Sequence, residues 1–303
     1  MCVVMWFRNL QLYRLPKDWA LASHELDAQL AKRALQACAP SDMQSLGWVD
    51  PAGRNTFVHS VNRQWLIALG AEQKLLPTTI VRQFAKDRAA EIEEREGRKV
   101  GRKEMRDLRE QVTAELLPRA FVRRRSTLAW IDPINGWLAV DAGARGKADE
   151  LVEFLIKTVS ELPIKTLKLT HAPAARMTTW VETGEAPAGF TVDQDLELRS
   201  PEEATIRYAR HTLEGEEIRR HIAKGKSATK LGMTWADRIS YVLADSMQIK
   251  RLAFLDVLKE ASEKEADNDD DRFDLDFTLM AGELARLLED LVEALGGEEG
   301  SPK

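Results

Sequence analysis

The sequence predicts an α+β fold with mixed or antiparallel sheets, flanking helices and a projecting helical hairpin. Strand-like alternation occurs in both halves of the chain, amphipathic helical stretches separate the strands, and there is no regular strand–helix alternation of the Rossmann kind. At 303 residues the chain also exceeds the usual size of one domain. We therefore expect an N-terminal α+β part at 1–76, a helical tip at 77–117, and a second α+β part at 118–303 with an acidic loop and a C-terminal helix.

Hydrophobic patterning, interrupted by proline and glycine, predicts the elements of the N-terminal part. In chain order they are a strand over 3–15, a helix over 19–37 capped by Asp18, turns at 47–48 and 51–53, and a hairpin of strands 57–61 and 65–69 that turns at Asn62 and Arg63. Pro16 ends the first strand and Pro40 closes the helix.

Two helices form the predicted tip. Pro77 and Thr78 open the first helix, the glycine-flanked segment 97–101 interrupts it, and a second helix reaches about residue 117. One face of the second helix is apolar (Met105, Leu108, Val112, Leu116), while arginines follow a different face at intervals of three and four (Arg98, Arg102, Arg106, Arg109). An ordinary charged helix surface also explains these arginines, because Glu104, Asp107 and Glu110 are interleaved with them.

The second α+β part contains most of the predicted strands. They cover 127–131 and 137–140, turning at Asn135 and Gly136, and then 190–198, 204–212, 228–235, 238–244 and 249–254. Helices are predicted over 147–160, 174–183, 216–223 and 277–295, an extended segment over 162–169, a loop over 186–191, and a solvated acidic loop over 260–274. Gly296 and Gly297 stop the last helix.

The formal net charge of −5 conceals a strong asymmetry. Residues 98–125 contain ten lysines and arginines against four acids, whereas residues 260–303 contain fifteen acids against four bases. An acidic chain of this kind remains compatible with a nucleic-acid partner, because a phosphate backbone responds to a local basic patch.

The stretch 116–132, LLPRAFVRRRSTLAWID, contains the densest basic group. We interpret Arg123, Arg124 and Arg125 as a loop beside a buried strand that binds a polyanion, because the planar guanidinium suits phosphate. A solvated basic turn is the alternative interpretation. A second basic set lies further along the chain, and the two sets need not be neighbours: Arg207, Arg210, His211, Arg219, Arg220, Lys224, Lys226 and Lys230.

Several familiar sites are excluded by spacing. Gly225-Lys226-Ser227 resembles the end of a P-loop, but Arg220 stands where the loop needs a glycine. The acidic run that begins at Asp267 has Arg272 where a calcium loop needs glycine. Cys2, Cys38 and the five histidines show no metal-binding spacing. We expect no metal and no cofactor.

The composition indicates a cytoplasmic protein without a membrane partner. No window of eighteen or more apolar residues occurs, and Arg8 and Arg14 follow the apolar N-terminal residues, where a signal peptide would place its charge before them. Two cysteines in 303 residues also argue against a disulfide framework.

No nucleophile with a nearby base is readable in the sequence, so we expect a protein that is not an enzyme. A metal-dependent nuclease that uses Asp132 and Asp141 is the main alternative, although turn caps explain both acids more simply. A second alternative is a protein-interaction module that docks through its acidic C-terminal region.

Six blocks are dispersed along the chain: MWFRNLQLYRL at 5–15, LLPRAF at 116–121, WIDPINGW at 130–137, IRYARHTLEGEEI at 206–218, GKSATKLGMTW at 225–235 and MAGELARLLEDLVEALGGE at 280–298. Together they resemble the bacterial RdgC family of recombination-associated proteins. The blocks occur in the family's order and spacing. The resemblance therefore covers the chain from end to end.

The resemblance implies a nucleoid-associated homodimer that forms a ring, binds double-stranded DNA with little sequence preference and restrains RecA-promoted strand exchange. It implies that Phe121 is an aromatic gate residue that packs against the partner subunit. Arg210 and His211 match the other gate positions, where the family pattern has Lys-Gln, so His211 departs from it. From the resemblance and the two basic sets we expect the following residues to contact DNA: Arg119, Arg123, Arg124, Arg125, Arg210, Lys224, Lys226 and Lys230.

Overall fold

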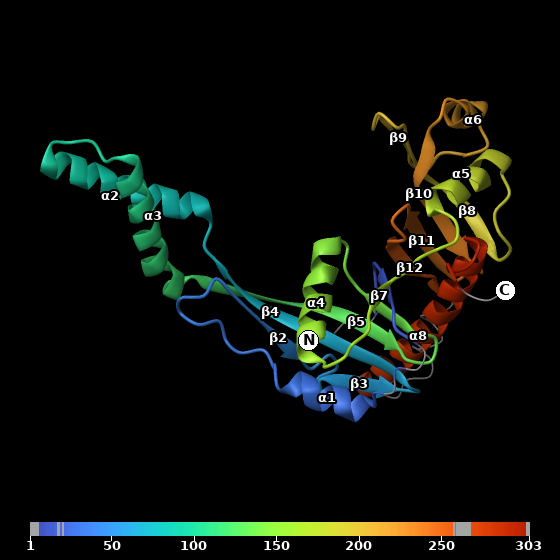
Figure 1. Ribbon diagram of the computed structural model, residues 1–303, viewed down its shortest axis with the longest axis horizontal. Coiled ribbons are helices and arrows are strands. Elements are labelled where there is room, and N and C mark those ends of the chain that lie inside the picture. Colours follow the sequence, from blue (N-terminus) through green and yellow to red (C-terminus); the bar gives the residue numbers. More distant parts are fainter. Residues whose placement is uncertain (1–5, 17–18, 20, 257, 259–267, 301–303) are drawn as a thin grey trace. The chain divides into compact units, whose positions relative to one another are not determined.

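A computed structural model describes residues 6–16, 19, 21–256, 258 and 268–300 of the chain (Figure 1). In chain order its elements are β1 (Gln11–Arg14), α1 (Ser23–Ala31), β2 (Gln44–Val49), β3 (Val58–Val61), β4 (Gln64–Leu75), α2 (Thr78–Glu96), α3 (Arg102–Leu116), η1 (Leu117–Arg119), β5 (Phe121–Asp132), β6 (Trp137–Val140), α4 (Arg145–Thr158), β7 (Lys165–Thr166), α5 (Pro173–Thr183), β8 (Phe190–Arg199), β9 (Thr205–Tyr208), α6 (Glu216–Ala223), β10 (Ser227–Trp235), β11 (Ile239–Ala244), β12 (Ile249–Phe254) and α8 (Asp269–Ala294). Helices and strands of this kind confirm the predicted α+β class.

The chain divides into two compact units. The larger unit comprises Met1–Gln29, Asp50–Ile67 and Thr127–Lys303, and the smaller unit comprises Leu30–Val49 and Ala68–Ser126. Strands β4 and β5 each contribute residues to both units. The predicted boundaries after residues 76 and 117 stay a prediction.

Two sheets contain the strands. One has seven strands in the order β2-β4-β5-β6-β1-β7, with β3 also pairing β4, and the other has five in the order β12-β11-β10-β8-β9. The pairings of β10 with β8 and β11, of β5 with β6 and of β3 with β4 are all antiparallel, which confirms the antiparallel character that was predicted. The hairpin between β3 and β4 turns at Asn62 and Arg63, as predicted, and both have positive φ (51° and 63°).

In the smaller unit, the turn predicted at 47–48 is wrong, because both residues belong to β2. Trp48 N donates to Arg33 O at 2.9 Å and Leu35 N donates to Trp48 O at 2.9 Å, so the preceding chain pairs with this strand. A Cβ on Gly47 would lie 2.3 Å from Leu35 Cα. The glycine therefore permits a close backbone approach in a strand, not a turn.

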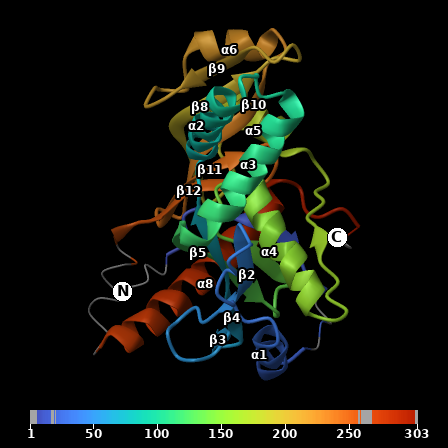
Figure 2. The same cartoon turned by 90° about the vertical axis from the view of Figure 1, so that its left-hand side faces the viewer.

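The predicted helical hairpin is confirmed in α2 and α3, which Figures 1 and 2 show as a connected pair. Gly97 ends α2 in the left-handed conformation (φ 66°), and Gly101 begins α3 in an extended one. Alanines on α2 and two apolar residues on α3 make most of the small core between them: Val81, Ala85, Ala89, Leu108 and Val112.

In the larger unit, the five-stranded sheet has one apolar and one polar face. Its apolar face contributes to a core with α5, α6 and α8, which includes Leu196, Leu231, Tyr241, Ile218, Trp180, Phe277 and Leu287. Figure 1 shows α8 and α5 beside this sheet, and Figure 2 shows α6 next to β9. The opposite face carries charged side chains, which are described below.

The N-terminal elements are shorter than predicted. Of the strand expected over 3–15, only Gln11–Arg14 forms β1, and residues 1–5 lie outside the described part of the chain. Residues 8–10 bond instead to β12, where Leu10 N donates to Ile249 O at 2.8 Å and Leu252 N donates to Arg8 O at 2.8 Å. The helix expected over 19–37 is α1, which ends at Ala31 because the chain from residue 33 pairs with β2. Asp18 lies outside the described residues.

The acidic loop predicted over 260–274 is wrong for its second half. Residues 269–274 form the start of α8, while residues 260–267 lie outside the described part of the chain. Asn268 caps the helix by accepting a hydrogen bond from Asp271 N at 2.9 Å. Asp269, Asp270 and Asp271 occupy the first turn, where the helix dipole favours negative charge. The acidic run therefore starts a helix.

Smaller differences concern the ends of elements. Only Lys165–Thr166 is a strand (β7) in the extended segment predicted over 162–169, and β9 covers four of the nine residues predicted over 204–212. The prediction for α6 is confirmed at both ends, and Gly296 and Gly297 follow α8 with positive φ, as the predicted stop requires.

Candidate nucleic-acid interface

The three successive arginines lie on a strand, not on a loop as predicted. Strand β5 begins at Phe121, one residue after the short 3₁₀ turn Leu117–Arg119. Successive side chains of a strand point to opposite faces, so Arg123 and Arg125 share one face with Phe121, and Arg124 points to the other. The arginines therefore do not form one cluster.

Arg124 is held by a buried carboxylate of the same unit. Its Nε donates to Glu72 Oε1 at 2.6 Å, and the backbone N of Cys38 donates to Glu72 Oε2 at 2.9 Å. The Cys38 amide and then Arg124 lower the pKa of Glu72. The pair is formally neutral, although 79% of the Arg124 side chain is exposed.

Phe121 is 85% exposed, the highest value among the large apolar residues that the structure describes as exposed. Val122 beside it is also exposed, and so are four apolar residues elsewhere in the smaller unit: Met43, Leu75, Ile80 and Phe84. Arg119 and Arg123 are exposed and Arg125 is half-buried. Exposed aromatic side chains of this size are typical of interaction surfaces.

On the helical hairpin, two of the four arginines in the predicted stripe form ion pairs. Arg98 donates to both oxygens of Glu104 at 2.7 and 2.8 Å, and Arg106 lies 3.7 Å from Glu110. For these two residues the interpretation as an ordinary charged helix surface is supported.

Arg210 and His211, the predicted gate residues of the second set, follow β9 in the larger unit. Arg210 N donates to Asp195 Oδ1 at 3.2 Å, and His211 N donates to Gln194 O at 3.1 Å. Arg210 has a positive φ of 53°. The backbone is thus fixed to β8 while both side chains are exposed.

Lys224 and Lys226 follow the C-terminal end of α6. Lys224 is exposed and Lys226 is partly exposed, and their backbone nitrogens donate to Arg220 O and His221 O at 3.2 Å each. Ile218 and Ile222 anchor this helix in the core. The structure places these lysines, Arg210 and Lys230 in the larger unit, whereas Arg119 and Arg123–Arg125 belong to the smaller unit.

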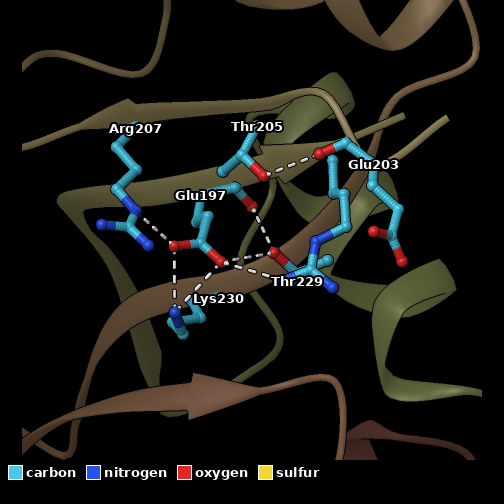
Figure 3. Close-up of polar contacts among 7 residues, drawn as sticks. Glu197, Glu203, Thr205, Arg207, Thr229 and Lys230 are labelled. Atoms are coloured by element: carbon cyan, nitrogen blue, oxygen red, sulfur yellow. Dashed lines mark hydrogen bonds and ion pairs between the residues drawn. The ribbon is translucent and has the colours of Figure 1, made fainter. Parts of the chain in front are cut away.

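Lys230 belongs to a cluster centred on Glu197. Glu197 on β8 is the register partner of Lys230 on β10 and of Arg207 on β9. Lys230 Nζ donates to its two carboxylate oxygens at 3.0 and 2.9 Å, and Arg207 Nε donates to Oε2 at 2.6 Å. Figure 3 shows Arg207, Lys230 and Thr229 converging on this carboxylate.

The cluster lies at the wall of a hollow on the polar face of the five-stranded sheet. Its volume is about 320 Å³, and its charged lining residues are Asp195, Glu197, Arg207, Lys230, Lys250 and Arg251. Four of these are basic and two acidic. Sequence reasoning included Arg207 in a basic set but missed Glu197, Lys250 and Arg251, because their convergence depends on strand register. The sequence feature that could have indicated the cluster is an acidic residue on one predicted strand with basic residues on the neighbouring strands.

Asp132 and Asp141, the acids of the nuclease alternative, cap backbone groups. Asp132 Oδ1 accepts from Ile134 N at 2.9 Å and Asn135 N at 3.1 Å, and Asp141 Oδ1 accepts from Asn9 N at 2.9 Å. Burial raises the pKa of Asp141. Within the described residues, no group of three or more His, Cys, Asp or Glu side chains is arranged to hold a metal ion.

In the part of the chain that the structure describes, none of the helices combines the length and apolar character that a membrane span requires.

Comparison with known proteins identifies the family. The model of the family described as "RdgC: Putative exonuclease, RdgC" matches residues 5–298. The chain is 57% identical to the recombination-associated protein RdgC of Herminiimonas arsenicoxydans over 97% of this chain and 99% of the relative. It is 55% identical to the protein of the same name from Janthinobacterium sp. (strain Marseille), again over 97% of this chain and 99% of the relative. The chain belongs to the RdgC family.

Proposed function

We propose that this protein is a non-enzymatic, ring-shaped homodimer that encircles double-stranded DNA without sequence preference. It acts in recombination by restraining RecA-promoted strand exchange, and it is located in the cytoplasm on the nucleoid. Family membership supports the role in recombination, since the relatives are named recombination-associated proteins.

The observation that carries DNA binding is the hollow lined by Arg207, Lys230, Lys250 and Arg251. It has four cationic side chains against two acids, in a protein whose overall charge is −5. Local positive charge of this kind attracts a phosphate backbone and reads no bases.

The resemblance to the family and the exposure of Phe121 support the ring. An apolar side chain that is 85% exposed is suited to a contact in which each subunit inserts it into its twofold mate. Arg210 and His211 are proposed to complete the second contact, with Arg210 keeping the charge of the family pattern.

Salt dependence tests the phosphate contacts. Duplexes of unrelated sequence are titrated at several salt concentrations, and the logarithm of the association constant is plotted against the logarithm of salt. We expect similar affinities for all sequences and a slope of about −0.9 for each phosphate neutralised. A slope near zero, or strong preference for one sequence, contradicts the proposal.

An exonuclease is the second candidate, because the family description contains that word. Against it, the two acids of the nuclease alternative, Asp132 and Asp141, are occupied by backbone amides in the structure. End-labelled linear duplex is incubated with Mg²⁺ and protein. Release of labelled nucleotides that is lost in Asp132→Ala, while the variant stays folded, would establish the enzyme and overturn our proposal.

A further inference from the structure

We propose that the hollow on the five-stranded sheet is a phosphate-binding pocket for the DNA backbone, in which Glu197 positions Arg207 and Lys230 toward the phosphate. The inference rests on the proposed binding of duplex DNA. Glu197 is an acid in a surface that binds an anion, and its role there is to position the two cations.

Glu197 is built into the sheet. Its side chain is 5% exposed, and its two register partners, Arg207 and Lys230, lie on the strands at either side of it. Thr229 Oγ1 donates to Glu197 Oε1 at 3.1 Å. Burial raises the pKa of Glu197, but hydrogen bonds from Lys230, Arg207 and Thr229 outweigh burial and lower the pKa to about 2. The carboxylate is therefore ionised at neutral pH.

Arg207 is fixed to Glu197 through Nε, which leaves its terminal amino groups out of this hydrogen bond. Arg207 donates to Glu197 through Nε, and 74% of its side chain is exposed. A guanidinium held in this way is fixed in orientation, and its two terminal amino groups are the donors that suit a phosphate. Fixing Arg207 and Lys230 before binding removes much of the entropy loss that ordering long side chains would cost.

The remaining charged lining residues, Lys250, Arg251 and Asp195, add one net positive charge to the hollow. Lys250 and Arg251 come from β12, and Arg251 Nη1 lies 3.0 Å from Asp195 Oδ2. Arg199 Nη2 lies 3.8 Å from Glu197, which adds a third cation around this carboxylate. The volume of about 320 Å³ is at the lower end of the range of small-ligand pockets, about 300–1,000 Å³, and admits a phosphate group with its first water molecules.

The alternative is that Glu197 only neutralises its neighbours. The two interpretations predict opposite changes in duplex affinity for Glu197→Gln. If the acid is a counter-charge, removing it makes the hollow more positive and tightens DNA binding. If it positions the cations, its loss frees Arg207 and Lys230 and weakens binding although the protein has become less negative.

The experiment measures the affinity of full-length wild type, Glu197→Gln and Asp193→Asn for one short duplex at low salt. Asp193 is the matched control, since it lies on the same strand, bonds Thr234 at 3.0 Å and does not line the hollow. We expect about tenfold weaker binding for Glu197→Gln, as for the loss of one charge-assisted contact. Asp193→Asn should stay within about twofold of wild type.

Equal or tighter binding by Glu197→Gln overturns the inference while leaving duplex binding intact. Wild type that binds no duplex overturns the proposed function instead. If Glu197→Gln fails to fold, as judged by thermal unfolding, the single variants Arg207→Gln and Lys230→Gln test whether the hollow binds the duplex. Each should weaken binding about tenfold and reduce the magnitude of the salt slope by about one, and unchanged affinity in either contradicts the pocket.

A second titration separates a DNA phosphate from a free phosphate compound. Pyrophosphate should displace the duplex from wild type more effectively than sodium chloride of equal ionic strength, and this advantage should be smaller in Glu197→Gln. If pyrophosphate binding depends on Glu197 while duplex affinity does not, the pocket serves a free phosphate compound and our assignment to DNA is wrong.

Discussion

The start of β5, with Arg124, and the hollow, with Arg207, contain the same arrangement of a glutamate and an arginine but differ in charge. In each, a buried glutamate accepts a hydrogen bond from the Nε of an exposed arginine at 2.6 Å: Glu72 from Arg124, and Glu197 from Arg207. The second oxygen of Glu72 accepts from the Cys38 amide, whereas Glu197 accepts from Lys230 as well. The first cluster is therefore neutral and the second keeps a positive charge.

The density of arginine along the sequence is therefore a poor guide to a phosphate site. Arg123, Arg124 and Arg125 are adjacent in sequence, but the strand sends them to alternate faces. Arg207, Lys230 and Lys250 lie far apart in sequence and line one hollow. We accordingly expect the end of β5 to serve self-association first and the hollow to serve DNA.

Truncation of Phe121 at the end of β5 should change dimer formation strongly. Phe121→Ala should raise the dimer dissociation constant about 30-fold or more, because truncating a central aromatic contact costs at least about 2 kcal/mol. The free energy of unfolding of its monomer should change by at most about 0.5 kcal/mol, because the side chain is 85% exposed. Analytical ultracentrifugation and urea unfolding measure the two quantities.

Phe277→Ala is the control for Phe121→Ala. Phe277 is fully buried, so its truncation should lower the free energy of unfolding by about 3–5 kcal/mol. An unchanged dimer dissociation constant in Phe121→Ala would remove the distinction between the two basic regions.

Removal of two cations from the hollow should have the next largest effect. The double variant Arg207→Gln, Lys230→Gln should lose about 100-fold in duplex affinity at low salt, since each charge-assisted contact contributes about 1.5 kcal/mol. Its dimer dissociation constant should equal that of wild type. Fluorescence anisotropy with a labelled duplex gives the affinity, and a loss below about threefold would contradict the proposed role of the hollow.

A single change at Arg124 should have a smaller effect. Arg124→Gln should weaken binding to all duplexes about equally and by no more than about tenfold, because Arg124 belongs to a neutral pair. The same anisotropy assay, run with duplexes of unrelated sequence, tests this. A loss as large as that of the double variant would mean that the end of β5 binds DNA as strongly as the hollow does.

A separate prediction concerns the contribution of Glu197 to acid stability. Its folded pKa of about 2 lies below the ordinary value of 4.5, so its stabilisation is complete above about pH 4.5 and is lost as the pH falls toward 2. Urea unfolding of wild type and Glu197→Gln between pH 6 and pH 2.5 should give a stability difference that shrinks with falling pH. A difference independent of pH would contradict the depressed pKa.

Sequence patterns were sufficient where local chemistry decides structure. The ends of α6, the glycines between α2 and α3 and the turn at Asn62 and Arg63 all follow from capping and turn preferences. Patterns failed at Gly47 and at the start of β5, where pairing with distant chain makes the strand. The cluster at Glu197 could not be predicted, because which acid faces which base depends on sheet register.

The most direct test of the central claim, that the protein encircles duplex DNA, is retention on closed circular and linear DNA of equal length. Complexes are formed at low salt and washed at about 1 M salt, where charge interactions are screened beyond about 3 Å. We predict that wild type stays on the circle and slides off the linear duplex, and that Phe121→Ala is lost from both. Equal loss of wild type from circular and linear DNA would contradict the account.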